Sequence, residues 1–280
     1  MSTDVINTEQ PIKGTRRRKL RDWVLRITKI LAIGAPLMFI MAGLGSKIGL
    51  WNWEFGLRTL TFKVGPVLLV ACGVFATLSM LLSIMAPKKG FFVGAFAMII
   101  PLVGMGQLAG MKNLVSSLPL IHDITTDTQN VPIFTQAIMS ERAKTENVNS
   151  LDYAGKMAPT KEKDANGKPV MKLVSALQTQ AYPKVRPLIL TAAPDVAFGQ
   201  AKAVASAMGW QIKSEDVSAG VLEATDSSFW YGFKDDVVIR IRASEGGGSI
   251  VDIRSVSRVG MSDIGANAKR IRIFLSKMAK

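Results

Sequence analysis

The sequence is poor in the two residue types that most often carry metal and redox chemistry. Its 280 residues include one cysteine, Cys72, and one histidine, His122. One cysteine excludes an intramolecular disulfide and a thiolate metal cluster, and one histidine excludes a histidine-rich zinc site. The chain also lacks a nucleophile elbow, a phosphate-binding loop and a zinc-protease motif. We therefore expect no metal, no cofactor and no catalytic residue.

Charge is missing from three long stretches in the N-terminal part of the chain. The uncharged stretches hold 17 residues between Lys29 and Lys47, 24 between Lys63 and Lys88, and 22 between Lys89 and Lys112. About 20 apolar helical residues cross the roughly 30 Å hydrocarbon core of a bilayer. The sequence thus predicts a three-helix transmembrane region over residues 30–112, although the first and shortest stretch also fits a signal peptide.

Positive charge around these stretches predicts their orientation. Eight Lys and Arg residues precede the first stretch, and Lys88 with Lys89 joins the second to the third. Because short loops rich in Lys and Arg stay in the cytoplasm, we place residues 1–29 and the Lys88 turn there. An odd number of spans puts residues 113–280 on the far side. We expect a multi-pass protein of a bacterial inner membrane with a periplasmic or extracellular domain.

The net charge of +14 is interpreted as part of this topology signal. Its densest run directly precedes the first apolar stretch, and no aromatic and basic platform accompanies it, so we expect no nucleic-acid partner. The expected partners are membrane lipid and an anionic ligand or envelope protein. Small residues spaced four apart in the third stretch, Gly90 with Gly94 and Gly106 with Gly110, favour close helix packing. That packing is either within the chain or in a homo-oligomer.

The last hundred residues carry the clearest local patterns. Strands are predicted at 187–191, 210–212, 220–225, 236–242 and 249–254. An amphipathic helix is predicted from Pro194 to Met208, and a final helix begins near Ser262 or Asp263. The order β-α-β-β-β-β-α predicts an α+β domain, an antiparallel sheet with two helices on one face. Residues 141–180 are polar without periodicity and are interpreted as a surface excursion.

Alternation along the strands at 236–254 sorts their side chains between two faces. The apolar set, expected to face the helices, is Val237, Ile239, Ile241, Val251 and Ile253. The opposite set is charged and comprises Asp236, Arg240, Arg242, Asp252, Arg254 and Arg258. Guanidinium groups bind carboxylates and phosphates, so Arg240, Arg242, Arg254 and Arg258 are candidates for an anion or phospholipid-headgroup site. The alternative is a solvated face of Arg–Asp pairs.

Other polar residues have local interpretations beside functional ones. Asp123, Thr125 and Asp127 lie just beyond the third apolar stretch, where they either ligate a hard cation or form a polar turn. Asp235 is adjacent to Asp236 on a predicted strand, so their side chains diverge, which argues against a paired acid and base. Two further polar residues are interpreted as belonging to the start of the final helix, Asp263 and Asn267.

Several of these segments are similar to a known family. They include IleHisAspIleThrThrAspThr (121–128), AlaTyrPro (181–183), GluAlaThrAsp (223–226), TrpTyrGlyPheLysAspAspValValIleArgIle (230–241) and ValAspIleArgSerValSerArgValGlyMetSerAspIleGlyAlaAsnAlaLysArgIle (251–271). Through them, residues 118–280 resemble domain-of-unknown-function family 1499, which occurs in bacteria and plastids. Lys184 departs from the acidic residue expected after TyrPro. The resemblance implies a fold and a membrane-anchored placement but no reaction.

Two functional hypotheses follow from the sequence. The first is a non-enzymatic envelope protein whose extracytoplasmic domain binds an anionic ligand, lipid headgroup or partner protein through the four arginines. The second is an envelope-modifying hydrolase or transferase that uses Asp123, Asp127 or Asp235 as a base.

Overall fold

The computed structural model describes residues 13–84 and 89–280. The predicted cytoplasmic turn at Lys88 and the first part of the predicted N-terminal segment lie outside the described residues. The chain divides into two compact units, Met1–Met111 and Lys112–Lys280.

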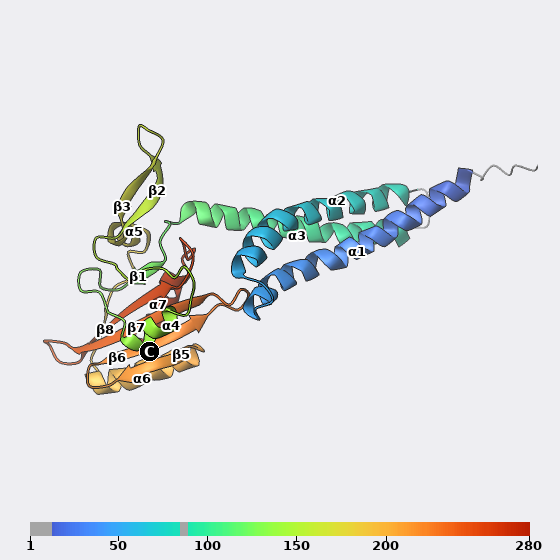
Figure 1. Ribbon diagram of the computed structural model, residues 1–280. Helices are drawn as coiled ribbons and strands as arrows, with labels where there is room; N and C mark the ends of the chain where they lie inside the picture. Colours follow the sequence, from blue (N-terminus) through green and yellow to red (C-terminus); the bar gives the residue numbers. More distant parts are fainter. Residues whose placement is uncertain (1–12, 85–88) are drawn as a thin grey trace, which may run out of the picture. The chain divides into compact units, whose positions relative to one another are not determined.

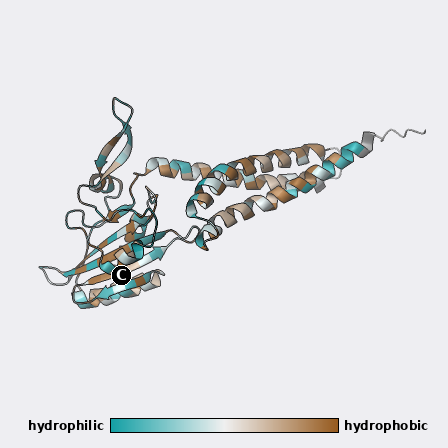
Figure 2. Cartoon of the chain, in the orientation of Figure 1, coloured by the Kyte–Doolittle hydropathy of each residue, from teal (hydrophilic) through white to brown (hydrophobic). Residues whose placement is uncertain are grey.

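Long apolar helices make up the first unit. They are α1 (Lys13–Lys47), the π-helix η1 (Phe55–Val64) that continues into α2 (Gly65–Leu82), and α3 (Lys89–Ser117). Three segments are long and apolar enough to cross a membrane: Arg16–Lys47, Phe55–Leu82 and Gly90–Ser117. Figure 2 shows how apolar residues dominate these helices. The three predicted hydrophobic helices are confirmed.

Small and polar residues hold α2 and α3 close together. A side chain at Gly94 would collide with the Ala76 carbonyl oxygen, and one at Gly90 would collide with Ser83. The Ser79 hydroxyl donates to the Gly90 carbonyl oxygen at 3.0 Å, which is an interhelical hydrogen bond in apolar surroundings. The Gly90 and Gly94 pair therefore serves packing within the chain. By contrast, open space surrounds the Cα positions of Gly106 and Gly110.

The second unit is built on an antiparallel sheet of six strands, drawn in Figure 1. The strands are β1 (Asp123–Thr125), β4 (Leu188–Leu190), β5 (Gln211–Asp216), β6 (Val221–Ser227), β7 (Lys234–Ala243) and β8 (Ser249–Ser257). They follow the order β1-β8-β7-β6-β5, and β4 pairs with β8 beyond the end of β1. Strand β8 therefore pairs with β7 along one side and with the two short strands β1 and β4 along the other.

Two amphipathic helices cover one face of this sheet, as predicted. Helix α6 (Pro194–Ala207) and helix α7 (Ala266–Met278) bury Phe198 and Phe274 against the apolar side chains of β7 and β8. The predicted inward set belongs to this core: Val237, Ile239, Ile241, Val251 and Ile253. From β4 onward the element order is β-α-β-β-β-β-α. Both the α+β fold and its order are confirmed.

The opposite face is covered as well. Helix α4 (Gln136–Arg142) and the segment before it place Phe134 and Ile138 against Val238 and Val256. These contacts form a second, smaller hydrophobic cluster. The charged side chains of β7 and β8 therefore lie largely beneath a covering layer, and the prediction of a solvated face is wrong for most of them. Alternation along a strand separates two faces but does not show what covers each one.

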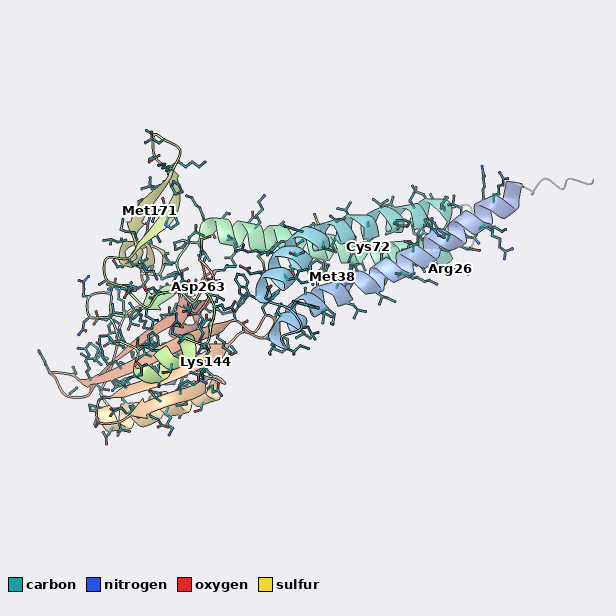
Figure 3. The ribbon with its side chains drawn as sticks, viewed as in Figure 1. Arg26, Met38, Cys72, Lys144, Met171 and Asp263 are labelled. Atoms are coloured by element: carbon teal, nitrogen blue, oxygen red, sulfur yellow. The ribbon has the colours of Figure 1, made fainter. Side chains whose placement is uncertain are left out.

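The polar region 141–180 contains a β-hairpin and most of a helix that the sequence did not predict. A separate hairpin of β2 (Met157–Lys163) and β3 (Pro169–Leu173), marked by Met171 in Figure 3, is largely exposed. Helix α5 (Val174–Ala181) instead joins the domain, because Gln178 is buried. The Gln178 amide accepts from the backbone N–H of Thr125 at 2.9 Å and donates to its carbonyl at 2.7 Å. It thereby satisfies the open edge of β1.

Helix α7 begins later than predicted. Neither Ser262 nor Asp263 is the N-cap; the helix starts at Ala266, and the residue before it, Gly265, has a φ of +77°. Asp263 nevertheless satisfies the free N–H groups of the start, accepting from Gly265 at 2.9 Å and from Asn267 at 2.7 Å. The turn between them has two residues with positive φ, Ile264 at +51° and Gly265 at +77°, of which only the glycine adopts this conformation without strain. This turn displaces the start of the helix by two residues.

Candidate functional site

Arg254 of β8 forms a two-pronged ion pair with Asp123 on the neighbouring strand β1. Its Nε donates to Asp123 Oδ1 at 3.0 Å, and its Nη2 donates to Oδ2 at 2.7 Å. The guanidinium also donates to two backbone carbonyl oxygens of the covering layer and lies near the rings of Phe134 and Tyr153. Both charged side chains are buried. Arg254 is thus held and neutralised from inside the domain.

Asp236 of β7 is a fully buried carboxylate that two arginines share. Arg258 contacts its two oxygens at 2.8 and 2.9 Å, and Arg142 of α4 reaches Oδ2 at 2.8 Å. The Thr225 hydroxyl donates to Oδ1 at 2.8 Å. Burial lowers the pKa of Arg142, and the hydrogen bond that it donates to Asp236 only partly opposes this. The cluster of Arg142, Arg258 and Asp236 therefore holds two positive charges and one negative charge.

Arg240 and Arg242 form a separate group nearer the surface. Both donate to Oδ2 of the buried Asp252, at 2.9 and 2.8 Å, and Asp127 lies 3.5 Å from Arg240 and 3.8 Å from Arg242. The side chain of Arg242 is 41% exposed, whereas that of Asp252 is 0% exposed. The four candidate arginines therefore do not converge on one point. They pair with three different carboxylates of the domain: Arg254 with Asp123, Arg258 with Asp236, and Arg240 and Arg242 with Asp252.

The other candidate carboxylates also have partners within the domain. Asp235 points away from Asp236 and accepts from Arg270 of α7 at 2.6 Å. Asp127 accepts backbone N–H groups at 3.1 and 2.8 Å and so closes a turn, in which the Thr125 hydroxyl donates to its carbonyl oxygen. Asn267 of α7 bridges to β8 and to the segment before β1. In the described part of the chain, no group of three or more His, Cys, Asp or Glu side chains is placed to hold a metal ion.

A small cavity opens beside β1 and next to Asp123. Its volume is about 140 Å³. The lining residues are Leu120, Ile121, His122, Asp123, Asn149, Lys156, Met157, Ala158, Pro159, Val174 and Met261. We call this cavity the Lys156 pocket. It combines an apolar wall with one ammonium, one imidazole, one side-chain amide and the carboxylate of Asp123, which is already paired with Arg254, a composition typical of small ligand sites.

Lys156 and His122 are hydrogen-bonded partners in this pocket. Lys156 Nζ lies 3.2 Å from His122 Nε2 and 3.3 Å from the Ser150 carbonyl oxygen. Burial lowers the pKa of His122, and the charge of Lys156 lowers it further. A neutral ring fits both of its contacts, with Nε2 accepting from the ammonium and Nδ1 facing the Met261 carbonyl oxygen at 3.4 Å. His122 therefore orients the ammonium without neutralising it.

In the described part of the chain, Lys156 forms no ion pair with a carboxylate. Among the described residues, no carboxylate oxygen lies within 4.0 Å of its Nζ atom. Burial lowers its pKa, and the nearby guanidinium of Arg254 opposes the favourable effect of Asp123. Asn149, whose side chain donates to the carbonyl oxygens of Ser257 and Gly260, fixes the pocket wall to the end of β8. The pocket thus holds a positioned cation beside a buried excess of positive charge.

Little in the sequence indicated this pocket. Lys156, Asn149 and Arg142 all come from the polar stretch or its border, where no hydrophobic period identifies buried positions. They reach the sheet through contacts between residues distant in the chain, such as the contact of Arg142 with Asp236. Two lining residues were conspicuous in the sequence: His122, the sole histidine of the chain, and Asp123, a candidate of the polar motif beyond the third apolar stretch.

Comparison with known proteins identifies a family for the soluble unit. A family model described as "Protein of unknown function (DUF1499)" matches residues 123–278, more than half of the chain. No curated protein matches the chain. The matched region runs from β1 to the last residue of α7 and contains the ion pairs, Lys156 and the sheet. The chain therefore belongs to the DUF1499 family.

Proposed function

We propose that this protein is a membrane-anchored binding protein that holds a small anionic group, a carboxylate or a phosphate, in the Lys156 pocket. The observation that carries the proposal is the Lys156 ammonium, which is positioned by His122 in a cavity and has no carboxylate within 4.0 Å among the described residues. An ammonium that is partly buried and has no counterion is stabilised most by an anionic ligand.

The buried arginines support this proposal by supplying charge. Arg142, Arg254 and Arg258 face only two carboxylates, Asp123 and Asp236. Charges in a poorly solvated interior are weakly screened, so the unmatched positive charge extends its potential to a neighbouring cavity. In this proposal Arg254 and Arg258 attract the anion from a distance, and Lys156 contacts it. Arg240 and Arg242 belong to the separate group around Asp252 and do not line the pocket.

The enzymatic alternative has weaker support in the geometry. Asp123 and Asp235 each accept hydrogen bonds from a guanidinium, and Asp127 accepts from backbone N–H groups of its own turn. A general base needs a lone pair that faces the substrate proton. These three carboxylates point into contacts of the domain, and none is paired with a nucleophile. Binding is therefore the function that the site supports best.

We also propose that the soluble unit lies outside the cytoplasm of a bacterial inner membrane. The support is the basic segment before α1 together with three helices of membrane-spanning length. A reporter that is active only in the periplasm should be active when fused after Lys280 and inactive when fused at Lys88. Activity at Lys88 alone would invert the topology.

Titration of inorganic phosphate and of acetate into the full-length protein in mild detergent tests the binding site. Lys156→Met should weaken the binding of whichever anion is held by about tenfold or more, since a hydrogen bond to a charged group contributes about 1.5–3 kcal/mol. Affinity should also fall as the pH rises through the Lys156 pKa, which burial places below that of an exposed lysine.

The matched control is Lys172→Met, which removes an exposed ammonium that pairs with Glu162 on the β2–β3 hairpin. This variant should bind the anion as tightly as the wild type. Equal affinity in the Lys156→Met variant, or absence of any anion binding by the wild type, would refute the proposed site.

A further inference from the structure

The loop between β6 and β7 exposes aromatic side chains. Phe229 is 68% exposed and Trp230 is 49% exposed. Within the soluble unit, all of which the structure describes, they are the only exposed aromatic residues. Their rings meet edge to face, with centroids 5.1 Å apart. Large exposed aromatic side chains side by side are unusual on a surface that contacts only water.

This loop has a fixed conformation. The backbone N–H of Ser228 donates to the Phe233 carbonyl oxygen at 2.8 Å, and the Phe233 N–H donates to the Ser228 hydroxyl at 2.9 Å. Gly232 has a φ of +66°, which closes the turn, and the Tyr231 and Phe233 rings stack at 5.7 Å. Because its backbone is already ordered, the loop presents Phe229 and Trp230 without a large entropic cost of binding.

The loop lies at the end of the sheet where the chain arrives from α3. Register places Asp235, the second residue of β7, opposite Ser257, whose N–H donates to the His122 carbonyl oxygen at 3.0 Å. Ser257 is also the last residue of β8, and the N–H of the next residue, Arg258, donates to the Lys234 carbonyl oxygen. The entering residue His122 and the start of β7, which follows the aromatic loop, therefore both lie at the end of β8. Figure 1 shows the loop where it joins the orange strands β6 and β7.

Chain connectivity keeps this end of the sheet near a bilayer. Helix α3, whose apolar part is long enough to span a membrane, ends at Ser117, and β1 begins at Asp123. Six residue steps reach at most roughly 20 Å. A tether this short gives a weakly lipid-binding loop a high effective concentration at the surface. Aromatic rings beside an exposed lysine, Lys234, are typical of residues that settle among lipid headgroups.

We infer that Phe229 and Trp230 insert into the headgroup region of the bilayer and dock the soluble unit on the lipid surface, with Lys234 facing the phosphates. The occupant of this surface is the lipid in which the helices of the same chain are embedded. This second contact restricts how the domain tilts and turns on its tether. It is independent of whether the Lys156 pocket binds an anion.

Nitroxide labelling of the full-length protein in phosphatidylcholine and phosphatidylglycerol vesicles tests this inference. Replacing the sole cysteine by Cys72→Ala allows one label to be placed by Phe229→Cys. The matched control is Val217→Cys, in the turn between β5 and β6 at the opposite end of the sheet, where the native side chain is 61% exposed. Oxygen, which concentrates in lipid, and a water-soluble nickel chelate then report the surroundings of each label.

The expected result is a several-fold lower nickel accessibility and a higher oxygen accessibility at position 229 than at 217, unchanged when the protein-to-lipid ratio is lowered. Equal nickel accessibility at both positions would overturn lipid docking. Protection that disappears on dilution into more lipid would also overturn it, because contact between copies then explains the shielding. Met261→Cys, at a 72% exposed residue near the same end, provides a second reading if the label at 229 disturbs the loop.

Discussion

The face of the sheet under α6 and α7 is mostly apolar, with a buried ion pair between Asp235 and Arg270, whereas the face under α4 and its neighbouring segment holds several ion pairs. Ile239 and Ile253 of the first face and Asp236 and Arg254 of the second are all buried. Burial of apolar surface stabilises in proportion to area and requires no specific partner. Burial of charge requires a partner with the right geometry for each group. The two faces should therefore respond to different kinds of substitution.

Asp236→Asn should be the most damaging isosteric change on either face. It keeps the side-chain volume but removes the charge that Arg142 and Arg258 share. Leaving buried guanidinium groups without a counterion costs about 4 kcal/mol. The measurement is the urea midpoint of the full-length protein in detergent. The unfolding is monitored by the fluorescence of Trp210, which stacks on Phe274 in the core.

The neighbouring residue provides the comparison with the apolar face. Val237→Thr also keeps the volume and introduces a hydroxyl among apolar side chains, for which we expect a loss of about 2 kcal/mol. If Asp236→Asn were no more destabilising than Val237→Thr, the charged face would not depend on matched ion pairs.

Asp263, labelled in Figure 3, is a carboxylate that accepts hydrogen bonds from backbone N–H groups only. Burial raises its pKa from 3.8 to about 6. Between these values the folded chain binds more protons than the unfolded chain, so this residue makes stability fall as the pH rises from about 4 to about 6. A shift of about two pKa units corresponds to roughly 3 kcal/mol.

Asp263→Asn should remove this pH dependence while it keeps an oxygen for the backbone donors. Relative to the wild type, the variant should therefore gain roughly 3 kcal/mol of unfolding free energy between pH 4 and pH 7. Urea unfolding at a series of pH values measures it. A difference that stays constant across this range would show that Asp263 titrates normally.

Arg242→Ala should have the smallest effect on stability, below about 1 kcal/mol, because this half-exposed arginine is screened by water. Arg240 remains as a partner of Asp252 in the variant. The same urea midpoint measures the change. A loss comparable to that of Asp236→Asn would mean that the Asp252 group behaves as part of the buried network.

Local sequence patterns predicted the apolar face well. The alternation of Val237, Ile239 and Ile241 identifies a strand and its buried side from that segment alone. The apolar stripe of α6 does the same for the helix. Three-residue β1 is too short to show a period, and α4 contributes a single fully buried apolar side chain, Ile138. These short elements escaped prediction for that reason.

The charged face shows why the site itself was only partly predicted. The strand pattern found Asp236, Arg254 and Arg258 on one side, but their partners Asp123 and Arg142 come from segments about 90 to 130 residues away in the chain. Without those partners the arginines look like an excess available for a ligand. The structure instead assigns them to internal ion pairs and leaves Lys156 as the cation beside a cavity.

Native mass spectrometry of the full-length protein, released from its own membrane in mild detergent, tests whether the Lys156 pocket holds an anion. We predict a stoichiometric co-purifying anion, which is lost in Lys156→Met and retained in Lys172→Met. Its mass would identify the ligand as a lipid or as a small soluble acid. A wild-type protein that carries no such mass and acquires none from added phosphate or acetate would contradict an anion-binding role for the Lys156 pocket.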